Sequence, residues 1–337
     1  MESIGTSAFN RCNSLQEVVF GKGLASIGSM CFNYCHKLER FVVDEANPNF
    51  KGVDGVLYSK NVDTLVLYPQ GRPDASFTMP ETVKHIGPYG IYEPQLLQAV
   101  TVSPILETID EFGMAGIALT GVLKLPATIT SIHFKAFQYD DGVTAFELPE
   151  SCAAYATVDG VLYDKEEKIL YAYPNALAEN ENTLKSSYSV PDGVETIAQG
   201  VFFYNQSLTN LTLPHSIQVL EADAFSDTAL RDIYYDGTQA DWNAIAKKVP
   251  TGGNVEQPFR EFYAEIHYLR ENTSTETTAA ITTIQTTTES TEGTSQTTSE
   301  ITTSVSVSTA TTTREQQTST ESETATTITT TSTASAS

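Results

Sequence analysis

Residues 4–27 read IGTSAFNRCNSLQEVVFGKGLASI, and a related stretch begins at Ile27 as IGSMCFNYCHKLERFVV. An Ile-Gly pair, a small residue with Phe, then Cys, Leu and an alternating apolar segment occupy matching positions, 23 residues apart. A fixed period of this length is the signature of a repeat architecture. The same spacing recurs farther along the chain, so we predict seven units, which start near residues 4, 27, 86, 109, 132, 197 and 220.

Two inserts interrupt this period, and they resemble each other. Val53–Pro69 reads VDGVLYSKNVDTLVLYP, and Val158–Pro174 reads VDGVLYDKEEKILYAYP, at an offset of 105 residues. The flanking units share that offset, which indicates that a block of two units and one insert has been duplicated. Each insert alternates apolar and polar residues around a polar turn, a pattern that predicts a β-hairpin. We place the two hairpin inserts within residues 50–80 and 155–190.

The pattern inside each unit explains why the units should stack. The alternating L-x-x-V-x-F segment predicts a short strand with every second side chain buried. The Ala-Phe pair after the isoleucine predicts a 3₁₀ or single helical turn on the opposite side. One unit cannot bury its own apolar row, whereas stacked units build a shared core of Ile, Phe and Leu. We therefore expect an elongated solenoid.

The motif I-G-x-x-A-F-x-x-C-x-x-L-x-x-V-x-F, followed by x-x-x-L-x-x-I, resembles the BspA-type, or Treponema pallidum-type, leucine-rich repeat of bacterial surface and secreted proteins. The D-G-V-L-Y inserts and the segment 234–245 are similar to features of that family, over about residues 4–268. Gly90-Ile91 and Gly113-Met114 depart from the Ala-Phe pattern. The resemblance implies an α/β repeat: a strand-rich leucine-rich-repeat solenoid with short helical turns and two inserted β-hairpins, followed by a disordered tail.

The chain divides into two regions of different composition. Residues 271–337 contain 28 Thr and 12 Ser and no aromatic residue, so they cannot bury enough apolar surface to offset the entropy of ordering. We predict a disordered linker or stalk there and a solenoid over residues 1–270. No signal peptide precedes the pattern and no anchor follows the tail, so we expect a fragment or a mature form of an extracellular or cell-surface protein.

The end of the solenoid carries its own cap over residues 236–270. Thr238 and Asp241 have the spacing of a capping box, which predicts a short helix over about residues 239–248. Trp242 and Ile245 should pack on the last turn, and 262–268 alternates as a final strand. Such a cap protects the exposed end strand of a solenoid.

Composition and motifs exclude several kinds of function. The net charge of -23 argues against nucleic-acid binding, and no apolar run is long enough to cross a bilayer. The five histidines lack zinc-ligand spacing, the acidic clusters lack calcium-loop spacing, and no nucleophile or phosphate-loop motif is present. Cys12 and Cys35 occupy the same slot in adjacent units, where we expect free thiols, although the spacing between turns would also allow a disulfide. We predict no enzyme activity, no cofactor and no metal site.

The remaining candidate is the outward face of the strands. This face is mixed in charge and has one aromatic residue; the insert tyrosines Tyr58, Tyr68, Tyr163 and Tyr171 could add to it or pack inward. The candidate binding residues are Glu17, Arg40, Thr101, Lys124, Glu147, Asn210, Arg231 and Tyr234.

The resemblance implies a non-enzymatic adhesion or protein-interaction module. We expect a monomer that binds a protein or glycan on host, matrix or neighbouring cells, without inserting into a membrane. The alternative is a structural spacer or recognition module of a larger extracellular protein, such as a carbohydrate-degrading one.

Overall fold

The structure is a computed structural model that describes residues 2–180, 183–247 and 264–271. The chain divides into two units, Met1–Glu271 and Asn272–Ser337, and the described residues all belong to the first. The predicted disordered tail, the last residue of the predicted helix and the first two of the predicted final strand lie outside the described residues. The predicted fold class is confirmed: the first unit is a strand-rich solenoid of about 11 turns.

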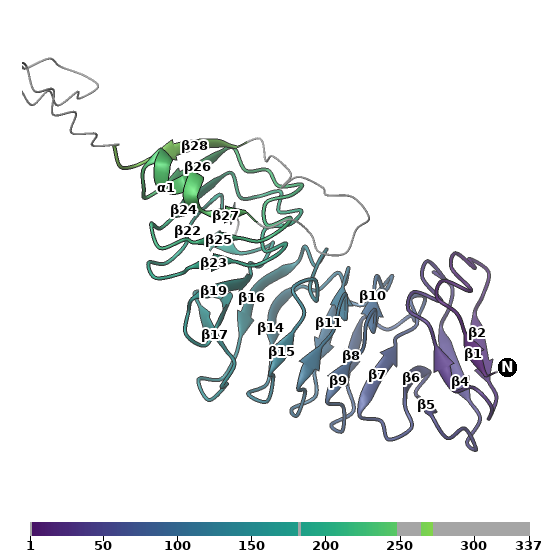
Figure 1. Ribbon diagram of the computed structural model, residues 1–337. Coiled ribbons are helices and arrows are strands. Elements are labelled where there is room, and N and C mark those ends of the chain that lie inside the picture. Colours follow the sequence, from purple (N-terminus) through teal and green to yellow (C-terminus); the bar gives the residue numbers. More distant parts are fainter. Residues whose placement is uncertain (1, 181–182, 248–263, 272–337) are drawn as a thin grey trace, which may run out of the picture. The chain divides into compact units, whose positions relative to one another are not determined.

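Short parallel strands on one side of the solenoid carry the repeat isoleucines, and we call them the isoleucine row (Figure 1). Ile4 pairs with Ile27, Ile86 with Ile109, and Ile109 with Ile132. The first strands of the row are β1 (Ser3–Ile4), β3 (Ser26–Ile27), β9 (His85–Ile86), β12 (Thr108–Ile109) and β15 (Ser131–Ile132). The row continues with β23 (Thr196–Ile197), β25 (Val219–Leu220) and β27 (Ala246–Lys247).

The alternating segments form a second set of parallel strands, which carries the predicted outward face. The pairing is in register at the repeat spacing, with Glu17 opposite Arg40 and Asn210 opposite Asp232. These strands are β2 (Glu17–Phe20), β4 (Arg40–Val43), β8 (Ser76–Thr78), β11 (Ala99–Thr101), β14 (Gly121–Lys124) and β16 (Val143–Glu147). Near the C-terminal end they are β22 (Ser187–Ser189), β24 (Asn210–Leu213), β26 (Asp232–Tyr235) and β28 (Glu265–Tyr268).

Each insert forms three antiparallel strands rather than a single hairpin. The added hairpin closes through Asp54-Gly55 in one insert and Asp159-Gly160 in the other, where both residues have positive φ, as a tight two-residue turn requires. The sequence contains this Asp-Gly signal, which the prediction of one hairpin overlooked. The strands are β5 (Phe50–Val53), β6 (Val56–Ser59) and β7 (Thr64–Leu67), and then β17 (Tyr155–Val158), β18 (Val161–Asp164) and β19 (Ile169–Ala172).

The inserts are also part of the stack. Leu65 of β7 pairs with Ile86, and Leu170 of β19 pairs with Ile197, so both leucines stand in the isoleucine row. The insert segments therefore build further turns of the solenoid, in addition to those of the predicted repeat units.

The middle strand of each insert is buried on both faces and separates two hydrophobic clusters. On β18, Val161 and Tyr163 face the C-terminal cluster, whereas Leu162 faces the central cluster. The alternation follows from the two-residue period of a strand. Leu57 on β6 likewise faces the N-terminal cluster, while its neighbour Val56 faces the central one. The inserts therefore divide the core into three parts.

The segments opposite the isoleucine row are successive turns. In the first unit, the Ala8 N–H donates to Gly5 O at 3.3 Å, and the Asn10 N–H donates to Ser7 O at 3.1 Å. Positive φ angles at Ser7 and Arg11 interrupt this i→i+3 pattern before it becomes helical. Where Gly-Ile and Gly-Met replace Ala-Phe, two short strands pair instead, β10 (Ile91–Tyr92) and β13 (Met114–Ala115).

The C-terminal cap contains α1 (Gln239–Ala244), the one helix among the described residues. The Thr238 side chain accepts from the Asp241 N–H, and the Asp241 carboxylate accepts from the Thr238 N–H, which completes the capping box. These hydrogen bonds from Thr238 lower the pKa of Asp241. Trp242 and Ile245 are buried against the last turns.

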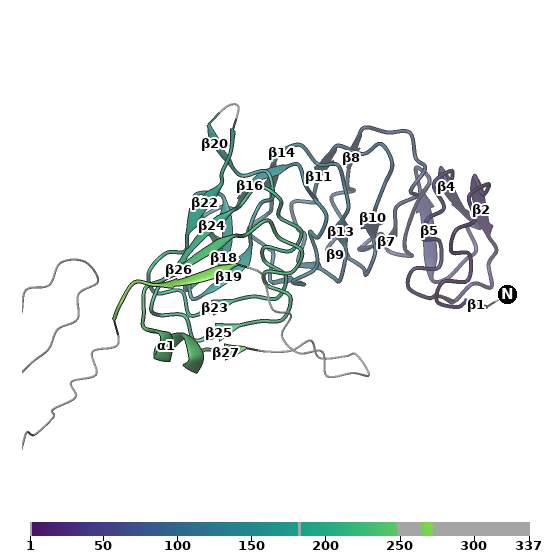
Figure 2. The same ribbon diagram turned by 90° about the horizontal axis from the view of Figure 1, so that it is seen from above.

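The second insert has an extra arm that the first insert lacks. Its strands β20 (Ala178–Asn180) and β21 (Thr183–Leu184) form a two-stranded antiparallel sheet that projects from the solenoid (Figure 2). The six additional residues of the second insert fall in this segment. The two inserts therefore share a framework and differ in what is attached to it.

Candidate functional site

All the residues predicted for the binding face lie at the surface of the solenoid. Glu17, Arg40, Thr101, Lys124, Glu147 and Arg231 are exposed, whereas Asn210 and Tyr234 are half-buried. Their positions on in-register parallel strands bring residues of neighbouring turns side by side. They do not converge on one pocket.

Four of these residues pair with one another instead of presenting free charges. Arg40 Nε donates to Glu17 Oε2, and Lys124 Nζ lies 3.1 Å from Glu147 Oε2. Each pair is 23 residues apart in sequence and directly opposite in the sheet. Exposed ion pairs of this kind add little stability. They do balance each positive charge of the pair with a negative charge on the neighbouring turn. The predicted face is therefore weakly suited to a charged ligand.

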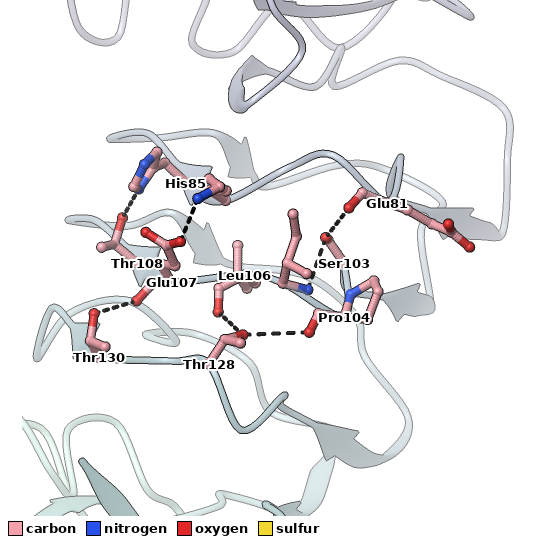
Figure 3. A network of polar contacts seen from close by, with 11 residues as sticks. Glu81, His85, Ser103, Pro104, Leu106, Glu107, Thr108, Thr128 and Thr130 are labelled. Carbon is pink, nitrogen blue, oxygen red and sulfur yellow. Dashed lines mark hydrogen bonds and ion pairs between the residues drawn. The ribbon is translucent and has the colours of Figure 1, made fainter. Parts of the chain in front are cut away.

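Polar side chains also tie neighbouring turns together beside the isoleucine row (Figure 3). Lys84 Nζ lies 2.7 Å from Glu107 Oε1, and His85 Nδ1 lies 2.9 Å from Thr108 Oγ1. The Thr128 hydroxyl donates to Leu106 O at 2.7 Å. Such contacts satisfy polar groups at the edges of the turns, which is a structural role.

Three possible metal ligands meet on the last two strands of the outward face. Donor atoms of Asp232, Glu265 and His267 all lie within 4.8 Å of one another. His267 Nε2 is 2.8 Å from Asp232 Oδ1, and the predicted residue Tyr234 stacks on the imidazole at 4.6 Å between ring centroids. The spacing search missed this group because its members come from strands more than 30 residues apart. The direct hydrogen bond already partners two of the three donors.

The turn side carries two groups of aromatic rings, which together we call the aromatic ridge. The first ring group has centroid separations of 5.1 to 5.8 Å and the second of 5.6 to 6.5 Å. Burial raises the pKa of both Tyr92 and Tyr139. Glu93 raises both further, through a hydrogen bond with Tyr92 and through its charge at Tyr139, so both ring groups lie near Glu93. The first group is Tyr89, Tyr92 and Phe112, and the second is Tyr139, Phe203 and Tyr204.

The backbone of the ridge is unusual for aromatic residues. Tyr89, Phe112, Tyr139 and Tyr204 all have φ between 53° and 66°, a left-handed conformation that costs a bulky residue about 1–3 kcal/mol. Gly116 stands one repeat before Tyr139 with a similar φ of 65° and meets the same turn geometry. The turn at Tyr139 therefore does not require an aromatic side chain.

The two inserts create equivalent crevices between the turns that flank them. Phe32, Phe41 and Tyr68 line the first crevice, and Phe137, Phe146 and Tyr173, each 105 residues later, line the second. The first encloses about 10 Å³ and the second about 30 Å³. The Tyr68 and Tyr173 hydroxyls are both buried without a hydrogen-bond partner. Of the insert tyrosines, which could face outward or pack inward, Tyr58, Tyr68 and Tyr163 pack inward.

A larger cleft of about 320 Å³ also opens at the second junction, and it shares Phe134 and Tyr171 with the second crevice. It lies where the isoleucine row is broken, because β15 and β19 belong to different sheets. The Tyr155 hydroxyl accepts from the Ile132 N–H at 2.9 Å in place of a strand partner. The cleft is lined by Asp110, Ser131, His133, Thr196 and Glu221 among others, and burial lowers the pKa of His133.

The predictions for the cysteines and for membrane-spanning segments can be compared with the structure. Cys12 and Cys35 carry free thiols. No helix in the described part of the chain has the length and apolar character needed to cross a bilayer. The sequence analysis missed the ridge and the crevices. A repeated signal was present, because a tyrosine follows the Cys-Phe, Ala-Phe and Val-Phe pairs at residues 34, 139 and 204.

A stack of short parallel strands with rows of buried Ile and Leu defines a leucine-rich-repeat protein. The model of the BspA type leucine rich repeat region matches six copies, over residues 1–53, 74–157 and 174–245. This chain belongs to the BspA-type leucine-rich repeat family. Members are often surface proteins that take part in protein interactions, and their solenoids are typically non-enzymatic.

Solved structures of bacterial proteins are similar in fold. A leucine-rich repeat protein from Eubacterium ventriosum is 23% identical with a TM-score of 0.50, over 77% of this chain and 65% of that one. A leucine rich cell surface protein from Faecalibacterium prausnitzii is 20% identical with a TM-score of 0.44, over 75% and 87% of the two chains. This chain thus spans less than two thirds of the Eubacterium chain, and at 23% identity the likeness to that structure shows the fold alone. A comparison with curated proteins gave no match.

Proposed function

We propose that the chain is a non-enzymatic, extracellular adhesion module that binds a protein partner through the aromatic ridge. The ridge carries the proposal because it gathers six partly exposed aromatic side chains on one side of a rigid scaffold. Tyrosine is enriched among the residues that dominate binding energy, since it offers a large apolar area and a hydrogen-bonding tip. The family's frequent role in protein interaction at the surface supports the same assignment.

The predicted strand face is a poorer candidate for the contact surface. It has one aromatic residue among the predicted positions, Tyr234, and this ring is stacked on His267. Its charges are largely matched between neighbouring turns. A partner would have to break these contacts before it could use them.

The test is a binding screen of the full chain against purified matrix proteins and a glycan array. A ridge variant, Tyr139→Ala with Tyr204→Ala, should weaken capture of a protein partner at least 30-fold, because hot-spot residues contribute about 2 kcal/mol or more. The matched control, Lys124→Ala with Glu147→Ala, should retain the affinity. Loss of binding in the control alone would move the contact to the strand face, and binding to glycans alone would contradict a protein partner.

The pairing between turns on the strand face favours one alternative, a structural spacer within a larger extracellular protein. In a spacer the surface serves only to hold the turns in register. The complete reading frame would then place catalytic or anchoring modules on either side. A spacer should also bind no partner in the screen, with ridge variants equal to the unaltered chain.

A further inference from the structure

Two residues that line the second crevice each have a buried oxygen atom without a hydrogen-bond partner. Asp140 is 3% exposed; its Oδ1 accepts from the Ile117 N–H at 2.7 Å, whereas its Oδ2 has no hydrogen bond. Tyr173 is 5% exposed, and its hydroxyl is also without a partner. Both residues line the crevice. A buried polar atom left unpaired costs about 1–3 kcal/mol, so such a pair calls for an explanation.

Aromatic side chains form a large part of the wall of the second crevice. Six of its lining residues carry rings, around a volume of about 30 Å³. The faces of aromatic rings attract cations, most strongly when the cation is shielded from water. The chain itself shows this preference nearby, since Lys135 Nζ lies 5.4 Å from the Phe134 centroid. The rings are Phe134, Phe137, Phe146, Tyr171, Tyr173 and Phe203.

The first crevice has similar aromatic walls but no carboxyl group. Cys35 stands where the second block has Asp140, and its N–H is held by the Gln70 side chain at 2.9 Å. The corresponding position is Cys12 in the first turn and Asn205 in the turn after the second insert. The fold thus accepts neutral residues at this position. The position therefore does not require an acid, and the Asp140 carboxyl group has one buried oxygen atom more than its hydrogen bond with Ile117 uses.

We propose that the second crevice binds a primary ammonium group, presented by a lysine side chain of a protein partner that docks on the aromatic ridge. The inference rests on the proposed function for the source of the ammonium group. The enclosed volume suits one ammonium head, since a water-sized group needs about 10–15 Å³ of such space. Phe203 belongs to both the crevice and the second ring group, which places the site beside the ridge.

An ammonium group has three donors, and the two unpartnered oxygen atoms of the crevice can accept from two of them. Asp140 Oδ2 and the Tyr173 hydroxyl oxygen can both accept from it, and the rings shield the charge from water. Burial raises the pKa of Asp140 well above its usual range, with a smaller contribution from Asp141. An arriving cation would favour the ionised carboxylate and convert an unfavourable buried acid into a charge-assisted hydrogen bond.

The experiment is a titration of the full chain with Nα-acetyl-lysine N-methylamide, followed by calorimetry and by NMR of the aromatic rings. The norleucine analogue, which lacks the amine, is the matched probe. The lysine probe should bind and shift ring signals, and the norleucine probe should do neither. Asp140→Asn should weaken binding at least tenfold, and Tyr173→Phe should weaken it by a smaller factor.

Tyr68→Phe is the matched control, because it removes the equivalent hydroxyl from the first crevice and should leave the affinity unchanged. Circular dichroism melting verifies that each variant is folded, and Asn205 shows that the turn accepts asparagine. Equal binding of both probes, or an unaltered affinity in Asp140→Asn, would overturn the ammonium site. If the probe fails while ridge variants still lose a captured protein partner, this inference is wrong and the proposed function stands.

Discussion

The two junctions created by the inserts have the same sequence framework and different interiors. At the first junction, Gln70 bridges the gap: its carbonyl accepts from the Cys35 N–H and its amide donates to Tyr92 O, both at 2.9 Å. At the second junction the shorter Asn175 reaches Asn205 and Asp141 instead. The first crevice encloses about 10 Å³, and the second about 30 Å³ with an acid inside. In a duplicated scaffold, a few different side chains can thus leave a smaller cavity in one copy and a larger cavity in the other.

The largest expected change in the free energy of unfolding comes from variants that test whether both inserts support the stack equally. Leu65→Ala and Leu170→Ala each remove a fully buried side chain from the isoleucine row. Each should lower the free energy of unfolding by about 2–5 kcal/mol, through lost burial and the cavity left behind. Urea denaturation followed by circular dichroism measures both. A negligible loss in one variant would mean that its insert lies outside the cooperative stack.

The next effect concerns the amide bridges of the two junctions. Gln70→Ala leaves the Cys35 N–H and Tyr92 O without their partner, so it should cost about 1–3 kcal/mol. Asn175→Ala should cost less, because one of its partners, the Asp141 carboxylate, is exposed and can bond to water. The same denaturation experiment compares them. A larger loss of stability in Asn175→Ala than in Gln70→Ala would show that the second junction depends more on its amide side chain than the first junction does.

A smaller change in stability is expected when Asp140, the acid that distinguishes the second crevice, is replaced. Because burial raises the folded-state pKa of Asp140, the folded chain holds this proton more tightly than the unfolded chain does. The associated stability is complete below the unfolded pKa, near 3.8, and is lost as the pH rises through the folded pKa. Asp140→Asn should therefore stabilise the chain by about 1 kcal/mol at pH 7 and not at pH 3. Equal effects at both pH values would contradict a perturbed carboxyl group.

The smallest effect concerns the predicted strand face. Lys124→Ala and Glu147→Ala remove an exposed ion pair, so each should change the free energy of unfolding by less than about 0.5 kcal/mol. Added salt should reduce even this difference, because screening weakens surface charges. A cost above 1 kcal/mol would mean that these contacts determine the stacking of the turns.

The repeat and its cap could be predicted because their signals are local. The 23-residue period, the offset of 105 and the spacing of Thr238 and Asp241 can all be read without coordinates. The predicted hairpin of each insert is present as β6 with β7 and as β18 with β19. The additional strands β5 and β17 were not predicted, because the turn at Asp54-Gly55 and at Asp159-Gly160 was not recognised. The prediction of the binding face used strand alternation alone, so it could not show that Lys124 and Glu147 pair with each other.

The sequence by itself determined the solenoid, since a fixed period forces equivalent residues into rows and alternation decides which of them are buried. Only the tertiary structure decided how the inserts enter the stack. That arrangement brings Asp140 and Tyr173 into one crevice and leaves an oxygen atom of each without a partner. The reason is physical: a pattern specifies which face of a strand is apolar, whereas a cavity and its unpaired atoms arise only when distant side chains fill, or fail to fill, the same volume.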